Sequence, residues 1–134
     1  MKNTFSKVLS VIFVCSLLLG TNVFAARTTL TLPKNQTWVS RSATRSGDYS
    51  NVHARLYAVY PTNGGEDNFT RIQVKLTSSG GKNMSDIYTL NETNKGNTSI
   101  KIYNGSLNTK SVKFQFRGNN PNYGAKADVY YSAR

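Results

Sequence analysis

Short stretches in which apolar and polar residues alternate are the feature that most constrains the fold of this chain. The clearest one is the segment 69–77, which reads FTRIQVKLT. Ile72, Val74 and Leu76 fall on one face of this segment, and charged or amide side chains fall on the other. A period of two residues is typical of a β-strand that turns one face to a core and the other to water.

Similar segments recur along the chain and are separated by turn-forming residues such as Gly, Asn, Pro and Ser. The eight expected strands cover residues 28–32, 36–41, 52–60, 69–77, 87–90, 98–103, 111–117 and 125–131. No stretch shows the periodicity of an amphipathic helix. We therefore predict an all-β fold, a single antiparallel β-sandwich of about eight short strands, with a small β-barrel as the alternative.

Three finer expectations follow from the same pattern. Strict alternation from Val52 onward places Tyr60 on the inner face of its strand and Val59 on the outer face. The polar residues 63–68, which begin with Asn-Gly-Gly, are expected to join the third and fourth strands as a hairpin with a long loop. Trp38 is expected to anchor the core.

The first 25 residues have the composition of a cleaved secretory signal peptide. Lys2 and Lys7 provide positive charge, residues 8–19 are almost continuously apolar, and residues 23–25 (Val-Phe-Ala) form an acceptable cleavage site before Ala26. The apolar run is shorter than the roughly 20 residues that a membrane-spanning helix requires. We therefore predict a signal peptide at 1–25 and one β-sandwich domain at 26–134.

Removing this leader changes the chemistry of the chain. It carries away Cys15, the only cysteine, so the domain would be disulfide-free. It also removes Lys2 and Lys7, so residues 26–134 keep 15 of the 17 basic side chains against six acidic ones, a net charge of +9. Export without cysteine indicates a bacterial producer. We expect a secreted, extracellular protein, or a periplasmic one if the producer is Gram-negative.

The outward positions of the expected strands are repeatedly basic, and with two loop tyrosines they form our candidate binding residues. The strands could place these cations on one sheet, with Tyr103 and Tyr130 between them, or scatter them over both sheets. Tyr49 and Tyr123 lie in polar loops, where aromatic side chains often serve recognition. The candidate binding residues are Arg71, Lys75, Lys101, Lys113, Arg117, Lys126, Tyr49 and Tyr123.

Few side chains suited to catalysis or to metal binding are present. His53 is the sole histidine, and no motif of a serine nucleophile accompanies it. A nuclease could pair His53 with Glu66 or Glu92. Asp48, Glu66 and Asp67 could offer oxygens to calcium, but their spacing matches no standard calcium loop. We predict no catalytic residue, no bound metal and no cofactor.

The function expected from these features is that of a small, basic, secreted interaction protein. It would be non-enzymatic and would dock through its Lys- and Arg-rich outer face on an anionic cell-envelope polymer or on a protein partner. The alternatives are a secreted toxin or antimicrobial factor acting on competitor envelopes, a small ribonuclease using His53, and an inhibitor presenting a loop to another enzyme. Nucleic acid is an unlikely partner for an exported protein without a recognised binding motif.

Overall fold

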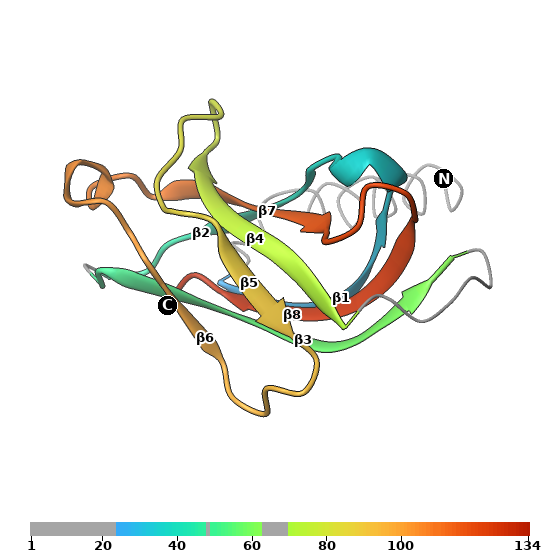
Figure 1. The fold of residues 1–134 in the computed structure, drawn as a ribbon. Coiled ribbons are helices and arrows are strands. Elements are labelled where there is room, and N and C mark those ends of the chain that lie inside the picture. Colours follow the sequence, from blue (N-terminus) through green and yellow to red (C-terminus); the bar gives the residue numbers. More distant parts are fainter. Residues whose placement is uncertain (1–23, 48, 63–69) are drawn as a thin grey trace, which may run out of the picture.

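The computed structural model describes residues 24–47, 49–62 and 70–134, and these fold into eight strands and two short 3-10 helices (Figure 1). The helices are η1 (Lys34–Gln36) and η2 (Asn104–Ser106). The strands are β1 (Ala25–Leu32), β2 (Val39–Thr44), β3 (Asn51–Pro61), β4 (Arg71–Ser78), β5 (Tyr88–Asn91), β6 (Thr98–Lys101), β7 (Ser111–Gly118) and β8 (Ala125–Ser132). Each expected strand is present, with ends shifted by at most three residues.

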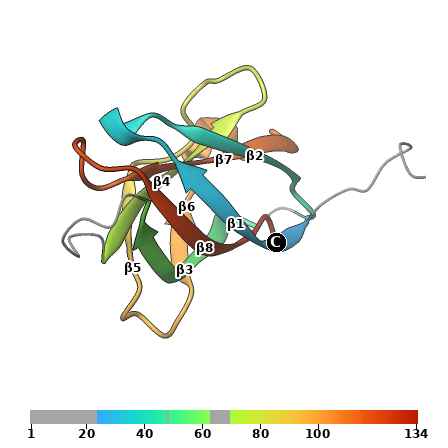
Figure 2. The same cartoon turned by 90° about the vertical axis from the view of Figure 1, so that its right-hand side faces the viewer.

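The strands form two four-stranded sheets that face each other as a sandwich (Figure 2). The first sheet has the order β1-β8-β3-β6, and the second has the order β2-β7-β4-β5. Neighbouring strands within each sheet are antiparallel. The prediction of an all-β antiparallel sandwich is confirmed, and the sheets do not close into the barrel considered as the alternative.

The core lies between the two sheets and is built from the inward half of each alternating strand. Phe114 and Phe116 of β7 are fully buried, and their rings contact Tyr131 of β8 at centroid distances of 5.0 and 6.2 Å. Apolar burial of this kind supplies most of the driving force for folding in a domain without disulfides. The other large, fully buried side chains are Leu30, Leu32, Leu56, Ile72, Leu76, Met84, Leu90, Ile100 and Ile102.

The alternation in β3 breaks in the middle of the strand, which corrects one of the finer expectations. Leu56 lies opposite Val129, but the next matched pair is Ala58 with Asp128, so Tyr57 is an extra residue in the ladder. Such a β-bulge reverses the facing of every residue that follows it. Val59 is therefore buried and Tyr60 is 62% exposed, the opposite of strict alternation.

The third and fourth strands do not form the expected hairpin. β3 belongs to the first sheet, whereas β4 belongs to the second, so the chain crosses from one sheet to the other between them. The residues of the predicted hairpin loop, 63–68, lie outside the described residues. The pairing partners of β3 are β6 and β8, which come much later in the sequence.

Trp38 is not a core anchor. Val39 at the start of β2 lies opposite the buried Phe116, so it points inward and Trp38, one residue earlier, points outward. The indole is half-buried over the outer surface of the second sheet, where Lys75 and Arg117 contact it.

The predicted signal peptide lies almost entirely outside the described residues. Of its residues only Phe24 and Ala25 are described. Ala25 begins β1 opposite Ser132, and the carbonyl of Phe24 accepts a hydrogen bond from the main-chain N–H of Ala133. In the described part of the chain, no helix is long and apolar enough to cross a membrane.

Candidate functional site

Four of the six predicted basic residues share the outer surface of the second sheet. Arg71 and Lys75 project from β4, and Lys113 and Arg117 project from β7, because their neighbours in each strand are the buried core residues. These two strands pair directly, so the four side chains stand on one surface. We call this surface, defined by Arg71, Lys75, Lys113 and Arg117, the cationic face.

No carboxylate lies among the outward residues of the strands that form this sheet. The neutral positions hold Ser, Thr, Asn and Gln side chains, several of which bond to one another. Gln115 accepts a hydrogen bond from Ser40 and donates one to Thr77, and Gln73 accepts one from Nε of Arg117 at 2.6 Å. The amide and hydroxyl groups thus hold the surface in place without neutralising its charge.

Trp38 contacts the two central cations of this face. The guanidinium carbon of Arg117 lies 4.3 Å from the centre of the indole, and Nζ of Lys75 lies 4.7 Å from it. Both distances are within the range of cation–π attraction. The ring therefore restricts these two flexible side chains and lowers the entropy that each would lose on binding a ligand.

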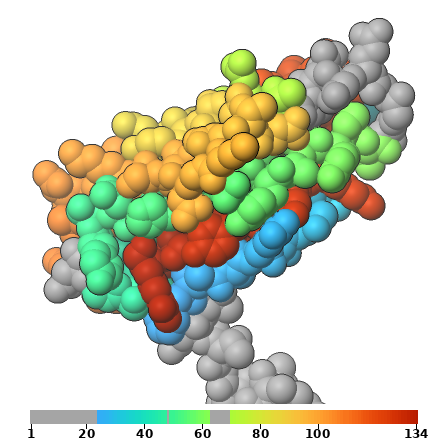
Figure 3. All heavy atoms as spheres, turned by 90° about the horizontal axis from the view of Figure 1, so that it is seen from below, coloured from blue at the N-terminus to red at the C-terminus, as the bar shows by residue number. Residues whose placement is uncertain are grey.

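The other two predicted cations are on the opposite side of the molecule. Lys101 ends β6 and Lys126 lies near the start of β8, and both face outward from the first sheet. Figure 3 shows this side, with β1, β8, β3 and β6 as adjacent blue, red, green and orange bands. The six basic residues therefore do not converge on one face. Tyr130, expected between them, also belongs to this first sheet.

The outer surface of the first sheet contains a charge pair that the second sheet lacks. Arg27 of β1 donates to both carboxylate oxygens of Asp128 on β8, at 3.2 and 2.8 Å. The bulged residue Tyr57 packs against Arg27 and Arg55, whose guanidinium carbons lie 3.8 and 4.4 Å from its ring centre. Part of the positive charge on this side is therefore already compensated within the protein.

The hydrogen bonds from Arg27 lower the pKa of Asp128 below its ordinary value. A carboxyl whose folded-state pKa is depressed stabilises the fold above its unfolded-state pKa and loses this effect as pH falls through the folded-state pKa. We therefore expect Asp128→Asn to lower the melting temperature at neutral pH, and the gap from the wild type to close in acid. Thermal unfolding measured from neutral pH downward tests this, and a gap independent of pH would contradict it.

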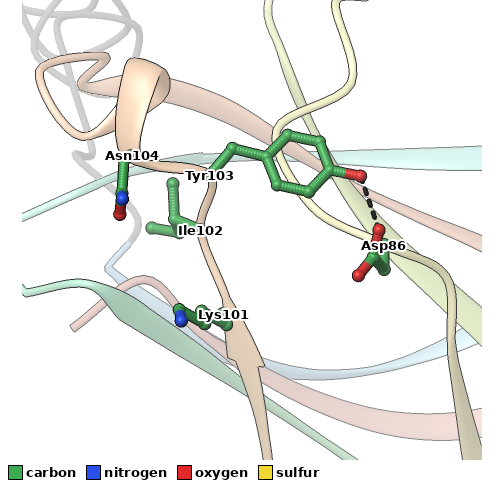
Figure 4. A pocket seen from close by; sticks show the side chains of 5 residues that line it. All are labelled: Asp86, Lys101, Ile102, Tyr103 and Asn104. Carbon is green, nitrogen blue, oxygen red and sulfur yellow. Dashed lines mark hydrogen bonds between the residues drawn. The ribbon is translucent and has the colours of Figure 1, made fainter.

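A shallow cavity of about 290 Å³ lies beside the end of β6 (Figure 4). Its lining includes Lys101, Ile102 and Tyr103, together with Asp86 from the loop before β5. The Tyr103 hydroxyl donates to Asp86 at 2.7 Å, and this bond raises the pKa of the phenol. Tyr103, predicted as the last residue of the strand 98–103, therefore lies after the end of β6 and donates to a carboxylate, away from the cationic face.

The two predicted recognition tyrosines lie at opposite ends of the sandwich. Tyr49, 62% exposed, is in the loop from β2 to β3. In this loop the main-chain N–H of Arg45 donates to the carbonyl oxygen of Lys110, just before β7. Tyr123, 37% exposed, is in the loop from β7 to β8, which is tied instead to residues just after β1 and β3. One small ligand cannot contact both side chains.

His53 is on the outer surface of the first sheet. Its Nδ1 lies 3.2 Å from a main-chain oxygen of Arg134, which accepts the hydrogen bond. Glu92 accepts a hydrogen bond from the N–H of Val59, six residues farther along β3. Six strand residues span about 20 Å, so Glu92 cannot act with His53. Outside the described residues lie the other nuclease carboxylate, Glu66, and the remaining calcium candidates, Asp48 and Asp67. Among the described residues, no cluster of His, Cys, Asp or Glu side chains could hold a metal ion.

Sequence reasoning missed Arg45, an arginine that follows β2 and is only 3% exposed. Its guanidinium donates to the carbonyls of Leu107, at 2.6 Å, of Thr109, at 3.1 Å, and of Tyr49. The side chain thereby fastens the loop that carries Tyr49 to the turn before β7. A basic residue at the end of a strand resembles a surface residue in the sequence, so nothing in the pattern distinguishes it.

No protein-family model matches the chain, and no curated protein matches its sequence.

Proposed function

We propose that this protein is a small, secreted, non-enzymatic interaction module that docks through its cationic face onto an anionic cell-envelope polymer. The observation that carries the proposal is the set of four cations on β4 and β7, with no carboxylate among the described outward residues of that sheet. A surface of this kind attracts polyanions at long range and keeps its cations available for contact. The export expected from the leader favours an envelope partner.

The contrast between the two sheets supports the choice of face. On the first sheet, Asp128 compensates Arg27, and Lys101 lies on the edge strand β6, where it lines the same cavity as Asp86. On the second sheet the cations occupy the two central strands, β7 and β4, where both neighbours hold them in place. A polymer lying on the second sheet would meet charge of one sign along its whole length.

The test compares two double variants that remove the same charge from opposite faces. Lys75→Gln with Lys113→Gln should weaken binding to immobilised wall polymer about 25-fold, because each lysine near an anionic surface contributes about 1 kcal/mol. Lys101→Gln with Lys126→Gln is the matched control and should weaken binding only a few-fold. Equal losses in the two variants would mean that net charge, and not the cationic face, determines binding.

Salt dependence provides a second test of the same proposal. Four contacts to a flexible polyanion predict a slope of about −3 when the logarithm of the association constant is plotted against that of salt concentration. Retention on wall material should therefore fall steeply between low and physiological salt. Binding that ignored salt would contradict an electrostatic interface.

Two activity assays separate docking from the alternatives. A docking module should bind acidic vesicles or wall material without releasing an enclosed dye, whereas leakage or growth inhibition would indicate a toxin. RNA cleavage that is lost in His53→Ala would indicate a nuclease and would contradict a non-enzymatic function.

A further inference from the structure

Three of the four cations of the cationic face occupy successive outward-facing residue pairs of the β4–β7 ladder, which we call steps. In this register Gln73 lies opposite Arg117, Lys75 opposite Gln115, and Thr77 opposite Lys113. Each of these cross-strand pairs thus combines one cation with one neutral polar residue, and the cation changes strand from each pair to the next. Arg71 adds a fourth step, two residues before Gln73 on β4 and opposite Asn91 of β5.

This arrangement spaces positive charge evenly along the strand direction. Successive outward residues on one strand are about 7 Å apart, so four steps place four charges along roughly 20 Å. Because the cations alternate between β4 and β7, they form a zigzag row in which no two stand directly opposite each other. A ligand with one negative charge per repeat could therefore meet one cation at each step.

The spacing identifies a class of polymer. A chain of phosphodiesters joined through a three-carbon polyol has six backbone bonds per repeat, the same number as two amino-acid residues, so its extended repeat is also about 7 Å. We propose that the cationic face binds a linear polyol phosphodiester polymer, such as poly(glycerol phosphate), lying along β4 and β7 with one phosphate at each step. This inference rests on the proposed docking function and specifies its ligand.

Two other classes of polyanion fit the face less well. Single-stranded nucleic acid has a similar phosphate spacing, but its binding sites combine basic grooves with aromatic rings free for base stacking. Trp38, the aromatic ring on this face, already has Lys75 and Arg117 against it. Polysaccharides with a carboxylate on every second sugar place their charges farther apart than the steps of the ladder.

The experiment measures binding of glycerol phosphate oligomers with one, two, four and eight phosphates to the full domain. Trp38 is the single tryptophan in the chain, so its fluorescence reports on the centre of the face. Affinity should rise about fivefold for each phosphate up to four and only gradually beyond. Oligothymidylate of equal charge and hyaluronan should bind at least tenfold more weakly; tighter binding of either would overturn the assignment to a polyol phosphodiester.

Two variants of equal net charge test the spacing itself. Lys75→Gln with Gln115→Lys moves a cation across one pair and keeps one charge at each step, so the four-phosphate oligomer should bind within about threefold of the wild type. Lys75→Gln with Thr89→Lys moves the charge to the step of Gln73, the residue opposite Thr89, and leaves the step of Lys75 empty. This variant should bind about fivefold more weakly.

The outcomes separate the two proposals. If both variants bind like the wild type, the matched spacing is wrong, although the cationic face can still be the docking surface. If removing Lys75 and Lys113 has no effect on binding to wall polymer, the docking function itself is wrong, and the inference about its ligand falls with it.

Discussion

Arg45→Met is expected to lower the free energy of unfolding by about 3 kcal/mol, because it removes a buried guanidinium that donates to three carbonyl groups in part-buried hydrogen bonds. Arg45 is 3% exposed, and its guanidinium donates to the carbonyls of Leu107, Thr109 and Tyr49. Met fills a similar volume but offers no N–H group. Urea denaturation followed by circular dichroism measures the change.

The matched control is Arg41→Met, the same substitution at a residue within β2. Arg41 is half-buried, and its guanidinium donates to the adjacent carbonyl of Ser40 at 2.9 Å. We expect a loss below about 1 kcal/mol there, as for most substitutions outside a buried network. If Arg45→Met cost no more than Arg41→Met, the arginine would not hold the two loops together.

Phe114→Ala is expected to cost about 4 kcal/mol, because it removes a large side chain from the centre of the core and leaves a cavity. Phe114 is fully buried and contacts the rings of Phe116 and Tyr131 at centroid distances of 6.4 and 5.0 Å. In a domain without disulfides, a loss of this size is a large fraction of the stability. Denaturant unfolding at 25 °C provides the measurement.

Tyr60→Ala is the control for the loss of an aromatic side chain. Because the bulge turns Tyr60 outward to 62% exposure, its removal should change the free energy of unfolding by less than about 1 kcal/mol. A large loss at Tyr60 together with a small one at Phe114 would reverse the assignment of inner and outer faces.

The strands could be predicted from sequence because alternation is a local property. Ile72, Val74 and Leu76 are buried as predicted, and Val112, Phe114 and Phe116 repeat the pattern in β7. Alternation fails where a single extra residue enters the ladder, as Tyr57 does. A bulge depends on how a strand matches its partner, and the segment 52–60 contains no information on β8.

The candidate site could be predicted only in part, for a related reason. Alternation correctly predicted that all six basic side chains face outward. The sheet to which each of them belongs, however, depends on pairing between distant segments. Lys101 and Lys126 were therefore grouped with cations that lie on the other side of the molecule. Trp38 was expected inside because of its size, whereas the inward direction of the next residue, Val39, determines that it faces out.

Mapping which amide resonances shift when poly(glycerol phosphate) is added to the labelled protein tests whether polyanions bind along β4 and β7. We expect the largest shifts on β4 and β7 and at the indole N–H of Trp38, and we expect them to vanish in high salt. Shifts concentrated around Lys126 and Tyr130 on the first sheet, or spread evenly over both sheets, would contradict binding along β4 and β7.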